Sequence, residues 1–265
     1  MVKKATPLFM TEAQLCAAFI SWAKHFGWTA YAETAGWDLL MVNAAGVQLG
    51  VQAKLTLNPK VMDQALERYW HWNCEGPDYR AVLVPTAGCG SLLAALGLGC
   101  FVPVDETRYR YRWSDDGRQE QEPISFVPQL PDFRGDLVQT LSGRVGCSCS
   151  NWHDWNPEKR HKLPQYVPDV VAGASGPVQL TEWKIKALRL CAVLEMRGFV
   201  TRYDFNSIGL DYRRWIGPPN DWLRADGAGR YVRGDGLRFP GQHPTVYAQI
   251  MAETAEALRT PGVAA

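Results

Sequence analysis

Apolar residues recur with a helical spacing and then with a strand spacing over the first hundred residues. Leu15, Phe19 and Ile20 repeat as on the buried face of a helix, which would begin at a capping box formed by Thr11 and Gln14. Extended and helical segments alternate after it: a helix is expected over 11–27, strands over 29–33, 36–42 and 47–55, a helix over 60–73, a strand over 80–87, a helix over 90–99 and a strand over 100–105. This order predicts a mixed sheet with helices packed on its faces.

The pattern weakens after residue 105 and becomes regular again near residue 179. The later part predicts three helices over 180–199, 201–209 and 210–217, a hairpin over 222–234 and a last helix over 243–259. Three helices followed by a hairpin are typical of a winged helix. The expected fold class is therefore α/β, or α+β, with a first domain over 1–113, a partly structured linker over 114–178 and a winged-helix-like domain over 179–265.

Composition limits the classes of function. The chain has 265 residues, 46% of them hydrophobic, and a formal net charge of +1. A nucleic-acid site must therefore rest on local basic patches instead of a global positive field. The seven cysteines are an odd number, the N-terminus lacks the apolar core of a signal peptide, and no apolar run approaches a bilayer span. We expect a cytoplasmic protein that does not enter a membrane.

Polar side chains interrupt two of the expected strands. Asp38 begins one strand, and Gln52 and Lys54 lie two positions apart on the next, which places both on one face because strands have a period of two. A carboxylate, an amide oxygen and an ammonium group suit phosphodiester hydrolysis, in which oxygen ligands hold Mg²⁺ and a lysine orients or deprotonates water. Glu33, at the end of the preceding strand, would supply a second carboxylate.

Residues 11–105 resemble the PD-(D/E)XK nuclease superfamily, which has the restriction-endonuclease-like fold. The resemblance rests on Asp38, the turn that follows, and the sequence "QAK" at 52–54 where the family has (D/E)XK. It implies a mixed sheet flanked by helices, with Asp38, Gln52 and the carbonyl of Ala53 as ligands of Mg²⁺ or Mn²⁺. It also implies a catalytic role for Lys54.

Two more positions are similar to polar residues of this superfamily. Gln64 resembles the glutamine that several branches carry on the helix after the lysine strand, and Glu12 resembles an acidic residue of the first helix. Gln52 departs from the commonest form, although modification-dependent, Mrr-like restriction enzymes resemble it with a Q-x-K sequence. The departure lowers the expected metal affinity, because a neutral amide binds Mg²⁺ more weakly than a carboxylate.

Each of these features also has an ordinary structural interpretation. Asp38 would cap a turn, and Lys54 would extend its ammonium group into water from a strand end. A nuclease fold that has lost its chemistry and is kept for binding is a second alternative.

A separate group of residues carries the atoms of a zinc site. Cys147, Cys149, His153 and His161 lie within fifteen positions of one another, but their spacing is not that of a standard zinc motif. We favour a loop over a metal site for this segment.

Basic residues gather in the C-terminal domain. Arg213 and Arg214 belong to the expected recognition helix, and Arg224, Arg230 and Arg233 lie on or beside the expected wing. Cations at these positions meet phosphates when a winged helix binds DNA. Protein contacts made by a winged helix are the alternative.

The sequence therefore predicts a metal-dependent deoxyribonuclease of restriction, phage defence or mobile-element processing. DNA is the expected partner, with RNA as an alternative. The sequence leaves the oligomeric state open, although cutting both strands usually requires two active sites, as in a homodimer or a complex with a partner protein. The competing hypothesis is a catalytically inactive nuclease-fold protein that binds DNA or another protein.

Overall fold

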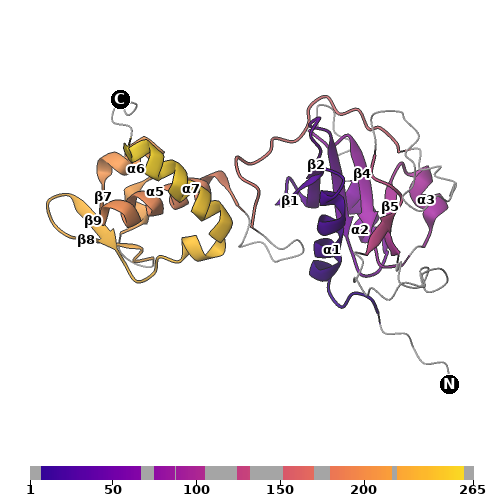
Figure 1. The fold of residues 1–265 in the computed structure, drawn as a ribbon, viewed down its shortest axis with the longest axis horizontal. Coiled ribbons are helices and arrows are strands. Elements are labelled where there is room, and N and C mark those ends of the chain that lie inside the picture. The colour runs from indigo at the N-terminus through magenta and orange to yellow at the C-terminus, as the bar shows by residue number, and fades with distance from the viewer. Residues whose placement is uncertain are drawn as a thin grey trace, which may run out of the picture. The chain divides into compact units, whose positions relative to one another are not determined.

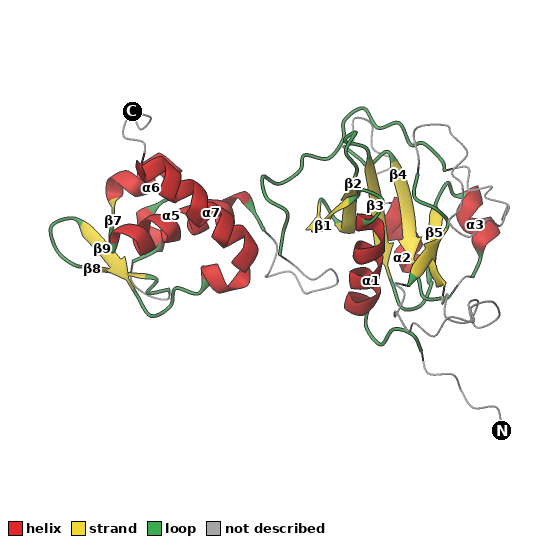
Figure 2. Ribbon diagram, in the orientation of Figure 1, coloured by secondary structure: helices red, strands yellow, loops and turns green. Residues whose placement is uncertain are grey.

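The chain forms two compact units in a computed structural model (Figure 1). Described residues up to Leu163 belong to the first unit, and those from Pro164 onward belong to the second. The first unit is rich in strands and the second in helices (Figure 2). The residues that the structure describes are 7–66, 75–86, 88–104, 124–131, 152–169, 180–216 and 220–259.

A six-stranded mixed sheet is the frame of the first unit, and its strands lie in the order β1-β2-β3-β4-β5-β6. β3, β4 and β5 run parallel, whereas β2 is antiparallel to both neighbours and β6 is antiparallel to β5. The elements in chain order are α1 (Glu12–Lys24), β1 (Thr29–Thr34), β2 (Trp37–Val42), β3 (Gln48–Ala53), α2 (Pro59–Leu66), β4 (Tyr79–Leu83), α3 (Gly90–Ala95), β5 (Gly99–Val104) and β6 (Ser125–Val127). The predicted order up to about residue 105 is confirmed.

Local chemistry sets the beginning of α1. The hydroxyl of Thr11 accepts a hydrogen bond from the backbone N–H of Gln14 at 3.1 Å, and the Gln14 side chain accepts one from the N–H of Met10 at 2.8 Å. These two bonds satisfy N–H groups that a helix start would otherwise leave without partners. The capping role predicted for Thr11 and Gln14 is thereby confirmed, although Gln14 reaches back one residue further than a standard box.

The helices cover the two faces of the sheet. Phe19 of α1 packs against Phe101 of β5 with ring centroids 4.7 Å apart. On the opposite face, Val61 of α2 and Leu93 of α3 join one buried cluster with Leu40 of β2. Figure 1 shows α1 in front of the strands and α2 behind them. The result is a three-layer α/β unit with an apolar core on each side of the sheet.

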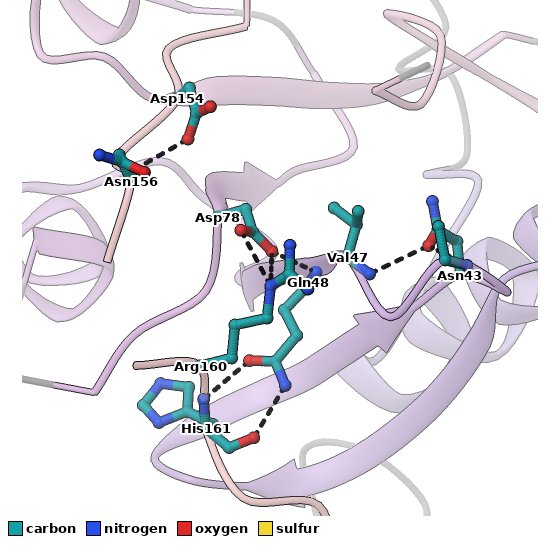
Figure 3. A network of polar contacts seen from close by, with 9 residues as sticks. Asn43, Val47, Gln48, Asp78, Asp154, Asn156, Arg160 and His161 are labelled. Carbon is teal, nitrogen blue, oxygen red and sulfur yellow. Dashed lines mark hydrogen bonds and ion pairs between the residues drawn. The ribbon is translucent and has the colours of Figure 1, made fainter. Parts of the chain in front are cut away.

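A segment from the predicted linker is part of the first unit. Residues 152–163, called the clamp below, run past the ends of the sheet at which β3, β4 and β5 begin (Figure 3). The Gln48 side chain bonds the backbone of His161 twice, from Nε2 to the carbonyl at 2.8 Å and from the backbone N–H to Oε1 at 2.9 Å. Asp78 accepts both from the backbone of Gln48 at 2.7 Å and from Arg160 at 2.8 Å. The clamp therefore completes the first unit, although about a hundred residues separate Gln48 from His161 in the sequence.

Aromatic side chains hold the rest of the clamp. Trp152 lies over Gly99, where an added Cβ would come within 2.3 Å of the indole ring. Trp155 donates from Nε1 to the carbonyl of Gly97 at 3.2 Å. The absence of a side chain at Gly99 thus leaves the room that the Trp152 ring occupies, and Gly97 does the same for the imidazole of His153, which a Cβ there would approach to 2.8 Å.

The second unit combines helices with a three-stranded sheet in the order β7-β9-β8, which is antiparallel throughout. Its elements are α5 (Glu182–Arg197), β7 (Val200–Thr201), α6 (Arg202–Ile208), η2 (Tyr212–Arg214), β8 (Leu223–Ala225), β9 (Arg230–Arg233), η3 (Phe239–Gln242) and α7 (Pro244–Arg259). The predicted helices and hairpin are present, but the third helix, expected over 210–217, is described only as the single 3₁₀ turn η2.

An aromatic core explains this arrangement. Trp215, only 1% exposed, packs with Phe205 at 5.7 Å and with Trp222 at 5.3 Å between ring centroids. The indole of Trp215 follows η2 directly and is drawn into the core, which is consistent with the chain leaving helical geometry there. In the described part of the chain, no helix combines the length and the apolar character needed to cross a membrane.

Candidate active site

The start of β2 separates from β3, and Asp38 fills the gap. The last hydrogen-bonded partners of this pair are Leu39 and Val51. Beyond them the carboxylate of Asp38 accepts a hydrogen bond from the backbone N–H of Ala53 at 2.8 Å. One carboxylate oxygen thus replaces a main-chain acceptor of the ladder, which fixes the side chain at the carboxyl end of β3.

Lys54 lies at the same end of the sheet and forms an ion pair. Its Nζ is 2.8 Å from Oε2 of Glu12 in the first turn of α1, with the two side chains 27% and 33% exposed. Glu12 is a predicted metal ligand, and in this structure it bonds the lysine. The sequence did not indicate this pairing, because the two residues are 42 positions apart.

The electrostatics of Asp38 and Lys54 are coupled. Burial raises the pKa of Asp38, while the hydrogen bond from Ala53 and the positive charge of Lys54 lower it in part. Burial lowers the pKa of Lys54, but the bond to Glu12 and the charge of Asp38 outweigh this, so that its pKa lies above the ordinary value. Lys54 is therefore a cation at neutral pH.

Gln52 lies beside the cluster formed by Asp38, Lys54 and Glu12. Its side chain is 4% exposed and donates from Nε2 to the carbonyl of Gly36, in the turn between β1 and β2, at 2.8 Å. This bond turns the amide nitrogen toward the turn and leaves Oε1 as the accepting end of the group.

A buried thiol lies beneath the charged residues. Cys16 of α1 is fully buried, and its burial, together with the charges of Asp38, Glu12 and Glu33, raises its pKa to about 12. The charge of Glu33 therefore acts on Cys16, while the expected role of Glu33 as a second carboxylate for a metal stays a prediction. Cys16 was not predicted as a site residue. The signal available in the sequence was its position four residues after Glu12, which places both on one side of a helix.

Gln64 belongs to a second group of residues. It lines a small pocket on α2, and its Oε1 is buried without a hydrogen-bond partner in the part of the chain that is described. The pocket is also lined by Ala35, Gly36, Trp37, Glu75, Arg80 and His161. Gly36 connects the two groups, since its carbonyl binds Gln52.

The Trp37 side chain forms the wall of this pocket. Its Nε1 donates to Nε2 of His161 in the clamp at 3.2 Å, and the guanidinium of Arg80 lies 5.7 Å from its ring centroid. The ring covers Gly50 so closely that a Cβ there would lie 2.5 Å from it. The clamp is thus connected through Trp37 to the turn that holds Gln52.

The four residues considered as a zinc site lie in or before the clamp. Cys147 and Cys149 lie outside the described residues. His161 accepts from Trp37, and His153 packs edge-on against Trp155 with ring centroids 4.8 Å apart. Within the described ranges, no three His, Cys, Asp or Glu side chains gather as a metal-binding group.

The predicted phosphate-binding arginines are all on the surface of the second unit, and Arg214 has no carboxylate partner among the residues that are described. The other four contact their own unit: Arg213 with Asp211 at 4.0 Å, Arg224 with Asp235 at 2.9 Å, Arg230 with Asp226 at 3.3 Å and Arg233 with the carbonyl of Leu237 at 3.4 Å.

The geometry places Glu12, Asp38, Lys54 and Cys16 together, with Gln52 anchored beside them and Gln64 in the adjoining pocket. Comparison of the chain with protein-family models, with curated proteins and with solved structures found no match.

Proposed function

We propose that the first unit is a metal-dependent nuclease that hydrolyses phosphodiester bonds in DNA, with the restriction-endonuclease-like fold. The observation that carries the proposal is that the Asp38 carboxylate and the Lys54 ammonium group lie close enough for each charge to shift the pKa of the other, at the carboxyl end of β3 and beside the acidic first turn of α1. Two features of the fold support it. One is the order of helices and strands, and the other is the mixed sheet, in which β2 is antiparallel to both of its neighbours.

The residues present fit a hard divalent cation. Asp38 keeps one carboxylate oxygen beyond the bond to Ala53, and Gln52 keeps its amide oxygen, so oxygen donors converge from two strands. The Ala53 carbonyl and the Glu12 carboxylate oxygen that does not bond Lys54 complete the proposed ligand set. Bound Mg²⁺ or Mn²⁺ would supply electrostatic stabilisation of the phosphate and of the attacking water.

The chain's own groups then have distinct roles. Lys54, a cation at neutral pH, orients the scissile phosphate and its water. Glu12 holds the ammonium group in position until the substrate arrives. The second unit, with a helical layout and a β7-β9-β8 sheet that support the winged-helix hypothesis, docks the nucleic acid through its surface arginines.

The test is cleavage of supercoiled plasmid with Mg²⁺ or Mn²⁺. Wild type should nick or linearise the plasmid, while Asp38→Asn and Lys54→Ala should not, because the first removes the anionic ligand and the second the cation. Lys24→Ala, at the exposed far end of α1, is the matched control and should cleave like wild type. Cleavage by Asp38→Asn at the wild-type rate would refute the proposed site.

A second candidate function is nucleic-acid binding without chemistry. It is favoured by one observation: the position that most family members fill with a carboxylate is Gln52, whose amide donates within the protein. Gln52→Glu distinguishes the two. Under the nuclease hypothesis, the added charge lowers the metal concentration needed for half-maximal cleavage. If wild type and Gln52→Glu are both inert on double-stranded, single-stranded and modified DNA, the binding function replaces the catalytic one.

A further inference from the structure

One surface of the second unit combines arginines with aromatic rings. The guanidinium carbon of Arg202 lies 4.7 Å from the ring centroid of Tyr212, and that of Arg213 lies 6.0 Å from the same centroid. Tyr231 stacks on Tyr212 with 6.1 Å between ring centroids and an interplanar angle of 25°. The hydroxyl of Tyr231 accepts a hydrogen bond from Nε of Arg202 at 3.3 Å. These contacts hold the Arg202 side chain in one orientation.

A second group of the same kind adjoins the first. Arg197 and Arg230 lie 4.7 Å and 5.4 Å from the ring centroid of Phe199. The two groups are neighbours because Arg230 pairs with Thr201 in the sheet, one residue before Arg202. We call the combined surface the arginine–aromatic face; it consists of Arg197, Phe199, Arg202, Tyr212, Arg213 and Arg230.

Three of the four cations of this face, Arg202, Arg213 and Arg230, are available to an anionic ligand, whereas Arg197 is held by the Asp204 carboxylate, whose side chain is 11% exposed. Arg202 has no carboxylate partner within the described ranges. Arg213 and Arg230 pair with Asp211 and Asp226, but in both pairs each side chain is at least 46% exposed. Exposed ion pairs contribute about 0–1 kcal/mol, so a phosphate can replace the aspartate at little cost.

The shape of the face determines which nucleic acid fits. A recognition helix enters the major groove of a duplex over several turns, whereas η2 is one turn of 3 residues. In its place the unit presents several guanidinium groups beside aromatic rings, with that of Arg202 held by Tyr212 and Tyr231, and Tyr203, next to Arg202 on α6, is 68% exposed. Cations along a backbone and exposed aromatic rings for stacking are the two requirements for binding single strands.

We propose that the arginine–aromatic face binds single-stranded DNA, with phosphates at Arg202 and its neighbouring arginines and a base stacked on Tyr203. The proposal extends the proposed function, since it names the form of nucleic acid that the second unit takes. It differs from the sequence-based hypothesis, in which Arg213 and Arg214 dock a duplex from a recognition helix.

Binding can be measured apart from cleavage. Fluorescence anisotropy of the full chain in EDTA would use a fluorescein-labelled oligo(dT) 20-mer and a duplex of the same length. Wild type should bind the single strand more tightly than the duplex. Arg202→Gln should weaken single-strand binding about 5-fold and reduce the salt slope by about 0.7, the value for one phosphate contact on a single strand. Tyr203→Ser should weaken it about 5- to 160-fold through lost stacking.

Arg259→Gln is the matched control, since Arg259 is an exposed arginine of the same unit at the end of α7. It should bind within twofold of wild type. The proposal is overturned if the duplex binds better, or if Tyr203→Ser and Arg202→Gln both behave like the control. Because Tyr203 is largely exposed, its variant should fold, which circular dichroism would check. The assay contains no metal and does not involve Asp38, so its outcome is independent of the cleavage test.

Discussion

Replacing Gln48 by Leu should open the clamp and destabilise the first unit. Gln48 is 3% exposed, and its amide bonds both the N–H and the carbonyl of His161, a residue that is 7% exposed. Leu keeps the apolar volume but leaves both backbone groups buried without partners. Each such group costs about 1–3 kcal/mol, and the burial of Leu offsets part of the sum, so we expect a loss of about 2–4 kcal/mol.

Hydrogen exchange followed by mass spectrometry is the appropriate assay, because a chain of two units need not unfold in one step. A loss of this size corresponds to amide exchange roughly 30 to 900 times faster in peptides that contain the clamp or β3. Arg160→Met is the control. It removes only the ion pair with Asp78, in which the arginine is 44% exposed, and should cost about 1 kcal/mol or less.

Equal exchange in Gln48→Leu and wild type would refute the reasoning, since it would mean that the two bonds to His161 do not hold the clamp in solution. A further consequence is functional. His161 accepts from Trp37, whose turn provides the carbonyl that binds Gln52. Under the proposed function, an opened clamp therefore also reduces cleavage, although Gln48 touches neither the metal nor the substrate.

Two substitutions near the site test its energetics. Asp38 has a raised pKa in the folded protein, so its contribution to stability is full below the unfolded pKa of about 3.9 and is lost as the pH rises through the folded pKa. In urea unfolding, the stability of Asp38→Asn relative to wild type should therefore increase between about pH 3.5 and pH 7. A difference in stability that does not change with pH would contradict this. Gly50→Ala would place a Cβ 2.5 Å from the Trp37 ring and should destabilise by about 1–3 kcal/mol. Gly88→Ala, with open space around it, is the control and should have an effect of about 0.5 kcal/mol or less; similar losses in both variants would show that the ring moves freely.

Much of the first unit was predictable because its signals are local. Thr11 and Gln14 set the helix start, and Asn43 organises the turn before β3 by accepting from the N–H groups of Ala45 and Val47. These contacts span only a few residues, and hydrophobic periodicity then fixes which faces are buried.

The parts that escaped prediction depend on long-range contacts. The pairing of Lys54 with Glu12 and the bonds from Gln48 to His161 join residues that carry no shared pattern in the sequence. The third helix of the second unit was predicted too long because apolar spacing over 210–217 indicates burial but not helical geometry. There the indole of Trp215 is taken into the core immediately after η2.

The clamp also determines when the first unit can be finished during synthesis. Gln48 precedes His161 by 113 residues, and Asp78 precedes Arg160 by 82. At about 5–20 residues per second, the ribosome takes roughly 6 to 23 s to travel from Gln48 to its partner. For that interval the nascent sheet has its helices but lacks the segment that closes the starts of β3, β4 and β5. Completion of the first unit therefore depends on residues that are made late. A ribosome that stalls before residue 152 leaves the starts of β3, β4 and β5 uncovered and accessible to chaperones and proteases.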